Sequence, residues 1–532
     1  MPLCDLCHRI RRDVWGKVSR WFAHVRGAAG PQHIRTPEPL PGTTEWIFHV
    51  SNDAVDTAAD ARIASQAAPA DAGDAGYSKD LKGRHVNMIA IGGAIGTGLF
   101  LGAGGRLHSA GPALAVAYLV CGIIAFFVVR ALGEMVLYRP SSGSFVSYAR
   151  EFLGEKGAYV AGWMYFLNWS TTCIADITAI ALYTHYWSFF TDIPQWLLAL
   201  AALAVVLAVN LISVKWFGEM EFWFAIIKVA ALVAFMFIGI FLVSTQHKVG
   251  GETPGLNMIT DHGGFLPNGL MPVVIVLQGV VFAYASLELV GVAAGETKDP
   301  QKVVPRAVNS IMWRVGVFYV GSVVLLALLL PGSVYSADES PFVTVLSKIG
   351  VSGAGDVMNF VVLTAAMSSL NSGLYSTGRI LRSMAMAGSA PKFTAKMNRN
   401  QVPYGGILLT ASVGVLGVAL NRVVPDQAFE IVLNVASLGI IGTWISIMVC
   451  HLAFVRRAKE GHLTRPNFRL PGSGVTQYVT IAFLLAVLGL MWKDAEVGRK
   501  TLFLIPIVAA GLVAGWYAIR RKADREAAEL GK

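Results

Sequence analysis

The sequence predicts an all-α polytopic membrane protein. Hydrophobic residues make up 55% of the 532 residues and charged residues only 14%, whereas a soluble domain carries about 25% charged residues. Mean hydropathy is +0.56, and the chain holds many uncharged apolar blocks of about 20 residues, the length that a helix needs to cross a bilayer core. The net charge of +10 comes from basic residues spread over short loops, so nucleic-acid binding is not indicated.

The N-terminal segment, residues 1–76, differs from the rest of the chain. It is rich in Ala, Asp, Gly, Pro and Arg and has no sustained hydrophobic period, so we predict a disordered cytoplasmic extension. Its CDLCH stretch at residues 4–8 matches the pattern of c-type haem attachment. That chemistry belongs to exported domains, and no signal peptide precedes the motif. We therefore expect no cofactor.

Twelve apolar segments are predicted to cross the membrane as helices. They cover residues 86–106, 112–138, 157–187, 194–213, 217–243, 268–296, 304–330, 354–386, 404–421, 427–455, 475–492 and 500–519. Loops that contain Pro, Gly or clustered charge separate most of them. We expect one transmembrane domain over residues 77–522, followed by a short cytoplasmic tail over residues 523–532.

Basic residues in the loops predict the orientation. If the first span starts in the cytoplasm, most loop lysines and arginines, including the cluster at residues 456–469, lie on the cytoplasmic side. The opposite loops carry fewer, among them Arg106, Lys248 and Arg422. Because short cytoplasmic loops are enriched in Lys and Arg, we predict that both termini lie inside.

Two of the predicted spans are interrupted by small residues. Residues 91–105 read IGGAIGTGLFLGAGG, and residues 280–295 of the sixth span read VVFAYASLELVGVAAG. Each glycine costs a helix about 1 kcal/mol relative to Ala, and hydrocarbon offers no water to a freed backbone group. The first and sixth spans are five helices apart. Because five is an odd number of crossings, two copies of a five-helix repeat would have opposite orientations in the membrane. Discontinuous helices at matching positions of inverted repeats indicate a transport site.

The interruptions offer complementary backbone groups. Unwinding of the GGAIGTG stretch leaves amide groups at the start of the second half-helix, where the macrodipole favours a carboxylate. Carbonyls freed around Ala94 and over residues 282–285 can accept from an ammonium group, so together they fit the backbone of an α-amino acid.

Helix packing through G-x-x-x-G faces is the alternative explanation of these glycines. It accounts for Gly92 with Gly96 and for Gly98 with Gly102. It does not explain the adjacent Gly92 and Gly93, or the second interruption in the sixth span.

Ionisable residues inside spans are functional candidates, since burying one costs at least about 2.5–3.5 kcal/mol. Lys228 lies well inside the fifth span, although a lysine there could also extend to the interface. Glu288 follows the sixth-span interruption, where it could relay protons or cap a half-helix. Arg130 and Glu134, four residues apart, are expected to form an ion pair within the second helix.

Polar residues on two other spans form a candidate side-chain pocket. Three recur every four residues along one face of the third span, and three more lie in the eighth. They are Asn168, Thr172, Asp176, Ser368, Ser369 and Asn371. A carboxamide has two donors and two acceptor lone pairs, which these side chains could satisfy. Hydrogen bonding between helices is an equally strong explanation for each residue taken singly.

Several long motifs resemble one known family. GGAIGTGLFLGAG, RALGEM at residues 130–135, PSSGSFVSYAREFLG at 140–154 and FAYASLELVGVAAGETKDP at 282–300 are similar to the amino acid transporter family of the amino acid-polyamine-organocation superfamily. The resemblance runs from about Tyr77 to Arg520. More narrowly, the third span and residues 368–393 resemble the branch of that family formed by bacterial L-asparagine permeases.

The resemblance implies a fold and a set of site residues. The fold is a 5+5 inverted repeat, with repeat one at 86–243 and repeat two at 268–455, broken helices 1 and 6, and two extra helices at 475–519. By position, the amides of Thr97 and Gly98 hold the substrate carboxylate. The carbonyls of Ala94, Phe282 and Ala285 hold its ammonium group, and the Phe282 ring gates the site. Other residues of these two segments complete the binding region: Ile95, Gly96, Ala283 and Ser286.

The function implied is transport by alternating access across a bacterial cytoplasmic membrane. By resemblance, Lys228 replaces the cation of sodium-coupled relatives, which implies coupling to protons. We expect an importer of L-asparagine, with another neutral amino acid such as proline or GABA as the alternative. An enzyme is not expected, because no metal-binding H-E-x-x-H motif or catalytic constellation is recognisable. A channel would need a pore-lining element repeated in an oligomer.

Overall fold

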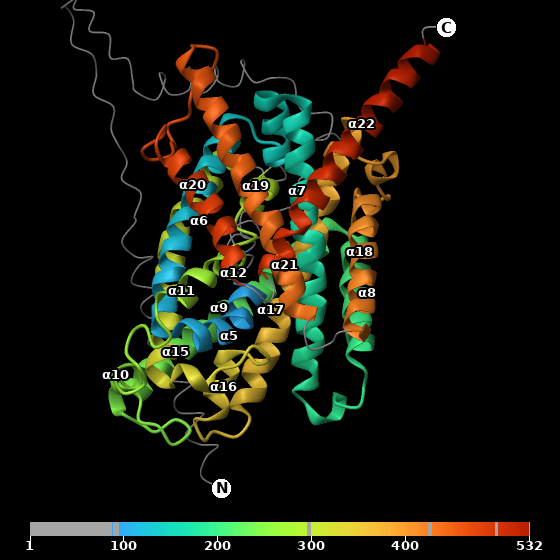
Figure 1. The fold of residues 1–532 in the computed structure, drawn as a ribbon. Coiled ribbons are helices and arrows are strands. Elements are labelled where there is room, and N and C mark those ends of the chain that lie inside the picture. The colour runs from blue at the N-terminus through green and yellow to red at the C-terminus, as the bar shows by residue number, and fades with distance from the viewer. Residues whose placement is uncertain (1–87, 89–94, 295–298, 424–427, 495–497, 531–532) are drawn as a thin grey trace, which may run out of the picture. The chain divides into compact units, whose positions relative to one another are not determined.

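The structure, a computed structural model, describes residue 88 and residues 95–294, 299–423, 428–494 and 498–530. Within these ranges the chain is helical and contains no β-strand (Figure 1). The predicted N-terminal extension, its CDLCH motif, and Gly92, Gly93 and Ala94 lie outside the described residues.

The first half of the described chain contains five helical regions. These are α4 (Thr97–Phe100) with α5 (Gly102–Ala110), η2 (Gly111–Ala113) with α6 (Leu114–Tyr138), α7 (Ser144–His185) with η3 (Ser188–Phe190), α8 (Gln195–Ile212), and α9 (Val214–Thr245). Gly111 has a φ of 61° and is followed by Pro112. The chain therefore turns sharply between α5 and α6.

The second half begins with a set of shorter helices. These are α10 (Asn257–Thr260), α11 (Leu270–Ile275), α12 (Leu277–Ala283), α13 (Leu289–Ala294), α14 (Pro300–Arg314), the π-helical η4 (Val315–Gly321), α15 (Ser322–Leu329), η5 (Gly332–Val334) and α16 (Pro341–Ser347). Longer helices follow: α17 (Ala354–Met386), η6 (Lys392–Ala395), α18 (Tyr404–Val423), α19 (Ala428–Lys459), α20 (Thr476–Leu490), η7 (Met491–Lys493), α21 (Gly498–Leu502) and α22 (Leu504–Leu530).

Within the described residues, the predicted spans fall largely on helices, but these helices differ from simple rods. Gly154, with a φ of 81°, divides α7 into a short first part and the long helix predicted at 157–187. The predicted seventh span comprises α14, η4 and α15. Among the described residues, nine helical segments are long and apolar enough to cross a membrane, and one of them, Thr97–Tyr138, contains both the first and the second predicted spans.

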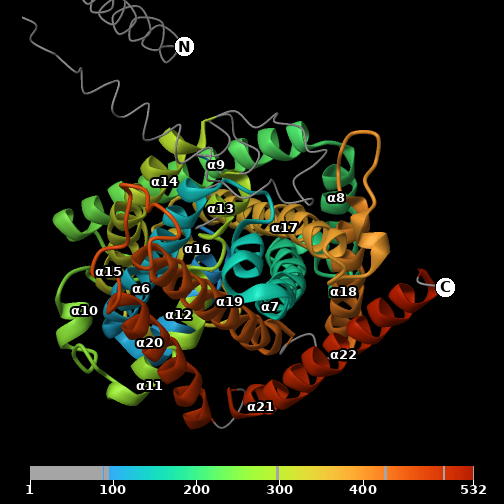
Figure 2. The same ribbon diagram turned by 90° about the horizontal axis from the view of Figure 1, so that it is seen from above.

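Burial separates central helices from lipid-facing ones. In the most apolar stretch of α17, 78% of the residues are buried, whereas in that of Gly498–Arg520 none is. Viewed from above, α7, α17 and α19 lie side by side, and α22 runs along the outside (Figure 2). An apolar helix that packs so little against protein is suited to contact with lipid. Its helix also continues to Leu530, into the predicted tail.

Candidate functional site

The first interruption lies at Gly96. This residue has an extended backbone (φ −126°, ψ −163°), and α4 begins at Thr97. The amides of Leu99 and Phe100 both donate to the Gly96 carbonyl, each at 3.2 Å. The amides of Thr97 and Gly98 belong to the first turn, where N–H groups have no partner within their own helix. They can therefore donate to a ligand.

The second interruption separates α12 from α13. Residues 284–288 are in turns, and Ser286 has a φ of 88°, which is rare for a residue other than glycine. Two carbonyls here already accept hydrogen bonds, because Ala285 N donates to Phe282 O at 2.9 Å within the turn and Tyr319 Oη of η4 donates to Ala283 O at 3.1 Å. A ligand at Phe282 O would use the second lone pair of that oxygen.

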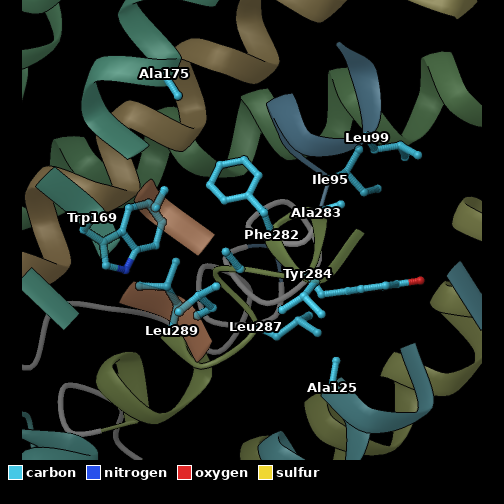
Figure 3. Close-up of a cluster of buried hydrophobic side chains, with 14 of the residues drawn as sticks. Ile95, Leu99, Ala125, Trp169, Ala175, Phe282, Ala283, Tyr284, Leu287 and Leu289 are labelled. Carbon is cyan, nitrogen blue, oxygen red and sulfur yellow. The ribbon is translucent and has the colours of Figure 1, made fainter. Parts of the chain in front are cut away.

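The two interruptions are in direct contact. A Cβ at Gly98 would lie 2.6 Å from the Ala283 Cα, so only glycine permits this approach. Figure 3 shows Ile95 and Phe282 close to Ala283 in this region, with Trp169 farther away. Phe282 is only 2% exposed. The first and sixth spans are therefore in contact at Gly98 and Ala283.

Two predicted pocket residues contact the first interruption, and a third is buried without a side-chain hydrogen-bond partner among the described residues. The Thr97 hydroxyl donates to Asp176 Oδ1 at 2.9 Å, which links α4 to α7. Ser369 of α17 faces Gly96, since its Cβ and Oγ lie 3.9 Å from the position of a Cβ there. The side-chain amide of Asn168 is fully buried and has no hydrogen-bond partner among the described residues. Asp176 and Ser369 therefore lie beside the first interruption, and the amide of Asn168 has unused hydrogen-bonding capacity.

The other three polar candidates have their own partners. Thr172 Oγ1 donates to the carbonyl of Asn168 in its own helix at 2.8 Å. Asn371 Oδ1 accepts from Asn210 Nδ2 of α8 at 2.7 Å, so it joins two helices. Ser368 belongs to a separate cluster around Lys228. Thr172 and the Asn371 oxygen are thus engaged in helix hydrogen bonds, while Asn371 Nδ2 has no hydrogen-bond partner among the described residues.

A buried ionic cluster surrounds Lys228. Its Nζ donates to Ser368 Oγ at 2.8 Å, and that hydroxyl lies 2.7 Å from both carboxylate oxygens of Glu221. Lys228 and Glu221 are 3.9 Å apart and at most 1% exposed. Sequence analysis missed Glu221. Its spacing of seven residues from Lys228, two helical turns, was the available signal.

Glu288 forms a second buried charged site. Neither carboxylate oxygen has a hydrogen-bond partner among the described residues. Trp169 of α7 and Trp444 of α19 lie near this carboxylate, and their indole N–H groups also have no hydrogen-bond partner among the described residues. Buried polar atoms without partners are rare in proteins. Both tryptophans were absent from the sequence-based candidates, because an apolar span gives no signal to distinguish them from core residues.

The predicted ion pair between Arg130 and Glu134 is wrong. Glu134 instead accepts from Arg465 Nε at 2.6 Å and from the Leu470 amide at 2.8 Å, and it lies 3.0 Å from His451 Nε2. Arg130 stacks on Phe468, 3.4 Å from the ring centroid. The loop between α19 and α20 outcompetes the intrahelical pair because it offers a buried carboxylate several donors at once.

Comparisons with known proteins agree in pointing to one family. The sequence model described as amino acid permease matches residues 85–528. A protein of Streptomyces coelicolor named L-asparagine permease is 78% identical over 482 residues, which cover 90% of this chain and 99% of the relative. Relatives of the same name from Salmonella typhimurium and Escherichia coli are 62% and 61% identical, each over 84% of this chain and 90% of the relative.

Proposed function

This chain belongs to the amino acid permease family, and from that premise we propose that it imports L-asparagine across the bacterial cytoplasmic membrane by proton symport. Family membership and the apolar helices make it an integral membrane transporter of amino acids rather than an enzyme. Asparagine is the substrate in the printed names of relatives that align along most of this chain. Another neutral amino acid, such as proline or GABA, is the second candidate.

The proposed architecture has twelve spans. Two inverted five-helix repeats, 86–243 and 268–455, hold the substrate between them, and two further helices at 475–519 lie outside. Alternating access then exposes a central site first to one face of the membrane and then to the other. The observation that carries this proposal is the close approach of two interrupted helices, with Gly98 against Ala283.

The interruptions supply the backbone groups that a zwitterion requires. The Thr97 and Gly98 amides bind the carboxylate at the positive end of α4. The carbonyls of Ala94, Phe282 and Ala285 bind the ammonium group. Ile95, Gly96, Ala283 and Ser286 complete the walls, and the Phe282 ring covers the bound amino acid.

The substrate side chain meets the polar residues next to the interruptions. Asn168, Asp176 and Ser369 offer a mixture of donors and acceptors that a carboxamide can satisfy. Asp176 is held by Thr97, so the element that binds the substrate backbone also positions a side-chain partner. This coupling favours a polar neutral side chain over an apolar one.

Proton coupling is proposed for the two buried charged sites. Lys228 and Glu221 share Ser368 across α9 and α17, and Glu288 lies in the α12–α13 interruption. Either site changes its charge when a proton arrives or leaves. Because a buried charge is costly unless it is paired, protonation can favour one arrangement of these helices over another.

Uptake into proteoliposomes tests the proposal. Purified protein is reconstituted into vesicles with an alkaline interior, and labelled asparagine is followed with and without an inward proton gradient. Each coupled proton should raise accumulation up to about tenfold per pH unit, since one unit is worth 1.36 kcal/mol. A protonophore should abolish the increase. Vesicles without protein give the background.

Two results would contradict the proposal. Accumulation that does not respond to the gradient would eliminate proton symport. Stronger competition by unlabelled proline or GABA than by asparagine would change the substrate assignment, and chemical conversion of the label would point to an enzyme.

A further inference from the structure

Arg106 is a buried arginine in the middle of α5 that the proposed transport mechanism does not use. It is 8% exposed, and its Nη1 donates to the Gly98 carbonyl at 3.0 Å. The hydroxyl of Tyr118 donates weakly to the same carbonyl at 3.4 Å. The guanidinium therefore lies one helical turn from the amides proposed to hold the substrate carboxylate.

Two glycines make the slot that holds this side chain. A Cβ at Gly102 of α5 would lie 2.7 Å from Arg106 Nη1, and a Cβ at Gly279 of α12 would lie 2.5 Å from Nε. The G-x-x-x-G explanation assigns Gly102 to a helix-packing face. Here its missing side chain gives room to a guanidinium instead, in the groove between the two interrupted spans.

Arg106 also lines an open pocket of about 550 Å³. The pocket is bordered by α5, by the segment around Ser336, by α19 and by Asp494 after α20. Arg106, Ser336 and Asp494 all lie in segments predicted to face outward. The pocket thus leads from the proposed outer surface to the guanidinium.

The charge of Arg106 has no acidic partner among the described residues. The ion pairs found within the described residues involve basic groups other than Arg106. Asp494 borders the same pocket, but its Oδ2 accepts from the Gly498 amide at 2.9 Å. A largely buried cation without a carboxylate partner is unusual in proteins. A planar guanidinium binds carboxylates through two parallel hydrogen bonds.

We propose that Arg106 is an outer capture site, which binds the α-carboxylate of the incoming amino acid before the amides of α4 receive it. A second polar group accompanies it, because Gln278 Oε1 is buried, borders the pocket and has no hydrogen-bond partner among the described residues. This oxygen can accept from the ammonium group of the same amino acid. The proposal rests on the proposed function and names a further residue for it.

Sided transport measurements test this role. Initial rates of asparagine uptake are compared in right-side-out and inside-out membrane vesicles carrying the wild type or Arg106→Gln. We expect KM to rise at least about tenfold in right-side-out vesicles, since a hydrogen bond to a charged group is worth about 1.5–3 kcal/mol. The maximal rate should change little. In inside-out vesicles, KM should stay within about twofold of the wild type.

Two further variants sharpen the result. Arg106→Lys retains the charge but not the paired geometry, so its KM in right-side-out vesicles should lie between the other two. It also provides the test if Arg106→Gln fails to fold. Arg422→Gln is the matched control, because Arg422 is exposed over Trp196 on the same proposed face and does not border the pocket. Its KM should equal that of the wild type.

The outcomes separate the inference from the proposed function. An unchanged KM in right-side-out vesicles, or an equal rise in both vesicle types, would overturn the capture site and leave Arg106 with a structural role at Gly98. A wild-type protein that does not transport asparagine at all would instead contradict the proposed function.

Discussion

Lys228 is connected to the rest of the molecule through one hydroxyl. Ser368 Oγ accepts from the lysine and donates to Glu221, so three buried side chains on α9 and α17 form one hydrogen-bonded unit. Removing one charge from such a unit leaves the other uncompensated. In the proposed mechanism, a change of protonation there favours a different arrangement of the two helices.

Replacing Lys228 by alanine should abolish gradient-driven accumulation of asparagine, because the unit can then no longer change charge through the lysine. Proteoliposome uptake with and without a proton gradient measures this. Lys215→Ala is the matched control, since Lys215 lies exposed at the start of the same helix, and it should accumulate asparagine like the wild type. Full accumulation by the Lys228 variant would refute the coupling role.

For single residues, the sequence best indicates functional candidates whose charge conflicts with an apolar span. Lys228 and Asp176 stand out because apolar spans rarely contain charge. Glu221 was missed because it lies near a helix end beside Glu219, where charges are ordinary. Arg106 was assigned to a loop, and its slot between Gly102 and Gly279 depends on α12, 170 residues away in sequence, which no local pattern reveals.

The contact between the two interrupted helices depends on the absence of a side chain at Gly98. Gly98→Ala would place a methyl group 2.6 Å from the Ala283 Cα, and backbone cannot move aside as a flexible side chain can. We expect a loss of about 1–3 kcal/mol, typical of overpacking, and a lower melting temperature in detergent. Asparagine should no longer raise that temperature.

Gly96→Ala provides the control for this contact. Its backbone is extended, and a Cβ there would meet only Ser369 at an ordinary 3.9 Å. Its melting temperature without substrate should therefore match that of the wild type. If both alanine variants melted like the wild type, close packing of α4 on α12 would not be required for the fold.

The sequence predicts helix boundaries where composition changes sharply. It does not predict boundaries that tertiary contacts determine. The apolar blocks and their Pro- or Gly-containing loops gave positions for all the long helices. The helix at 144–153 and the break at Gly154 lie outside every predicted span, because that segment is polar. The loop between α19 and α20 was also taken as a connector, yet it supplies Arg465 and Leu470 to the buried Glu134.

On the scale of the whole molecule, membrane spans cannot be counted from helix length alone. Nine helical segments within the described residues meet the criteria of length and composition. α7 falls outside that set although it lies at the centre, because its buried face carries Asn168, Thr172 and Asp176. The polar residues that lower its hydropathy are the ones that a transport site needs. The sixth span also falls outside that set, because its interruption divides it into short helices.

The orientation of the whole chain follows from its loop charges and is open to direct measurement. We expect both termini in the cytoplasm, since the last turn of α19, which leads into a loop predicted to be cytoplasmic, carries Arg456, Arg457 and Lys459. A fluorescent protein fused after Lys532 should fluoresce, and alkaline phosphatase fused there should be inactive. The same reporters placed after Gly251, in a loop predicted to lie outside, should give the opposite pattern and serve as the control. Reversal of both patterns would invert the molecule and place the Arg106 pocket on the cytoplasmic face.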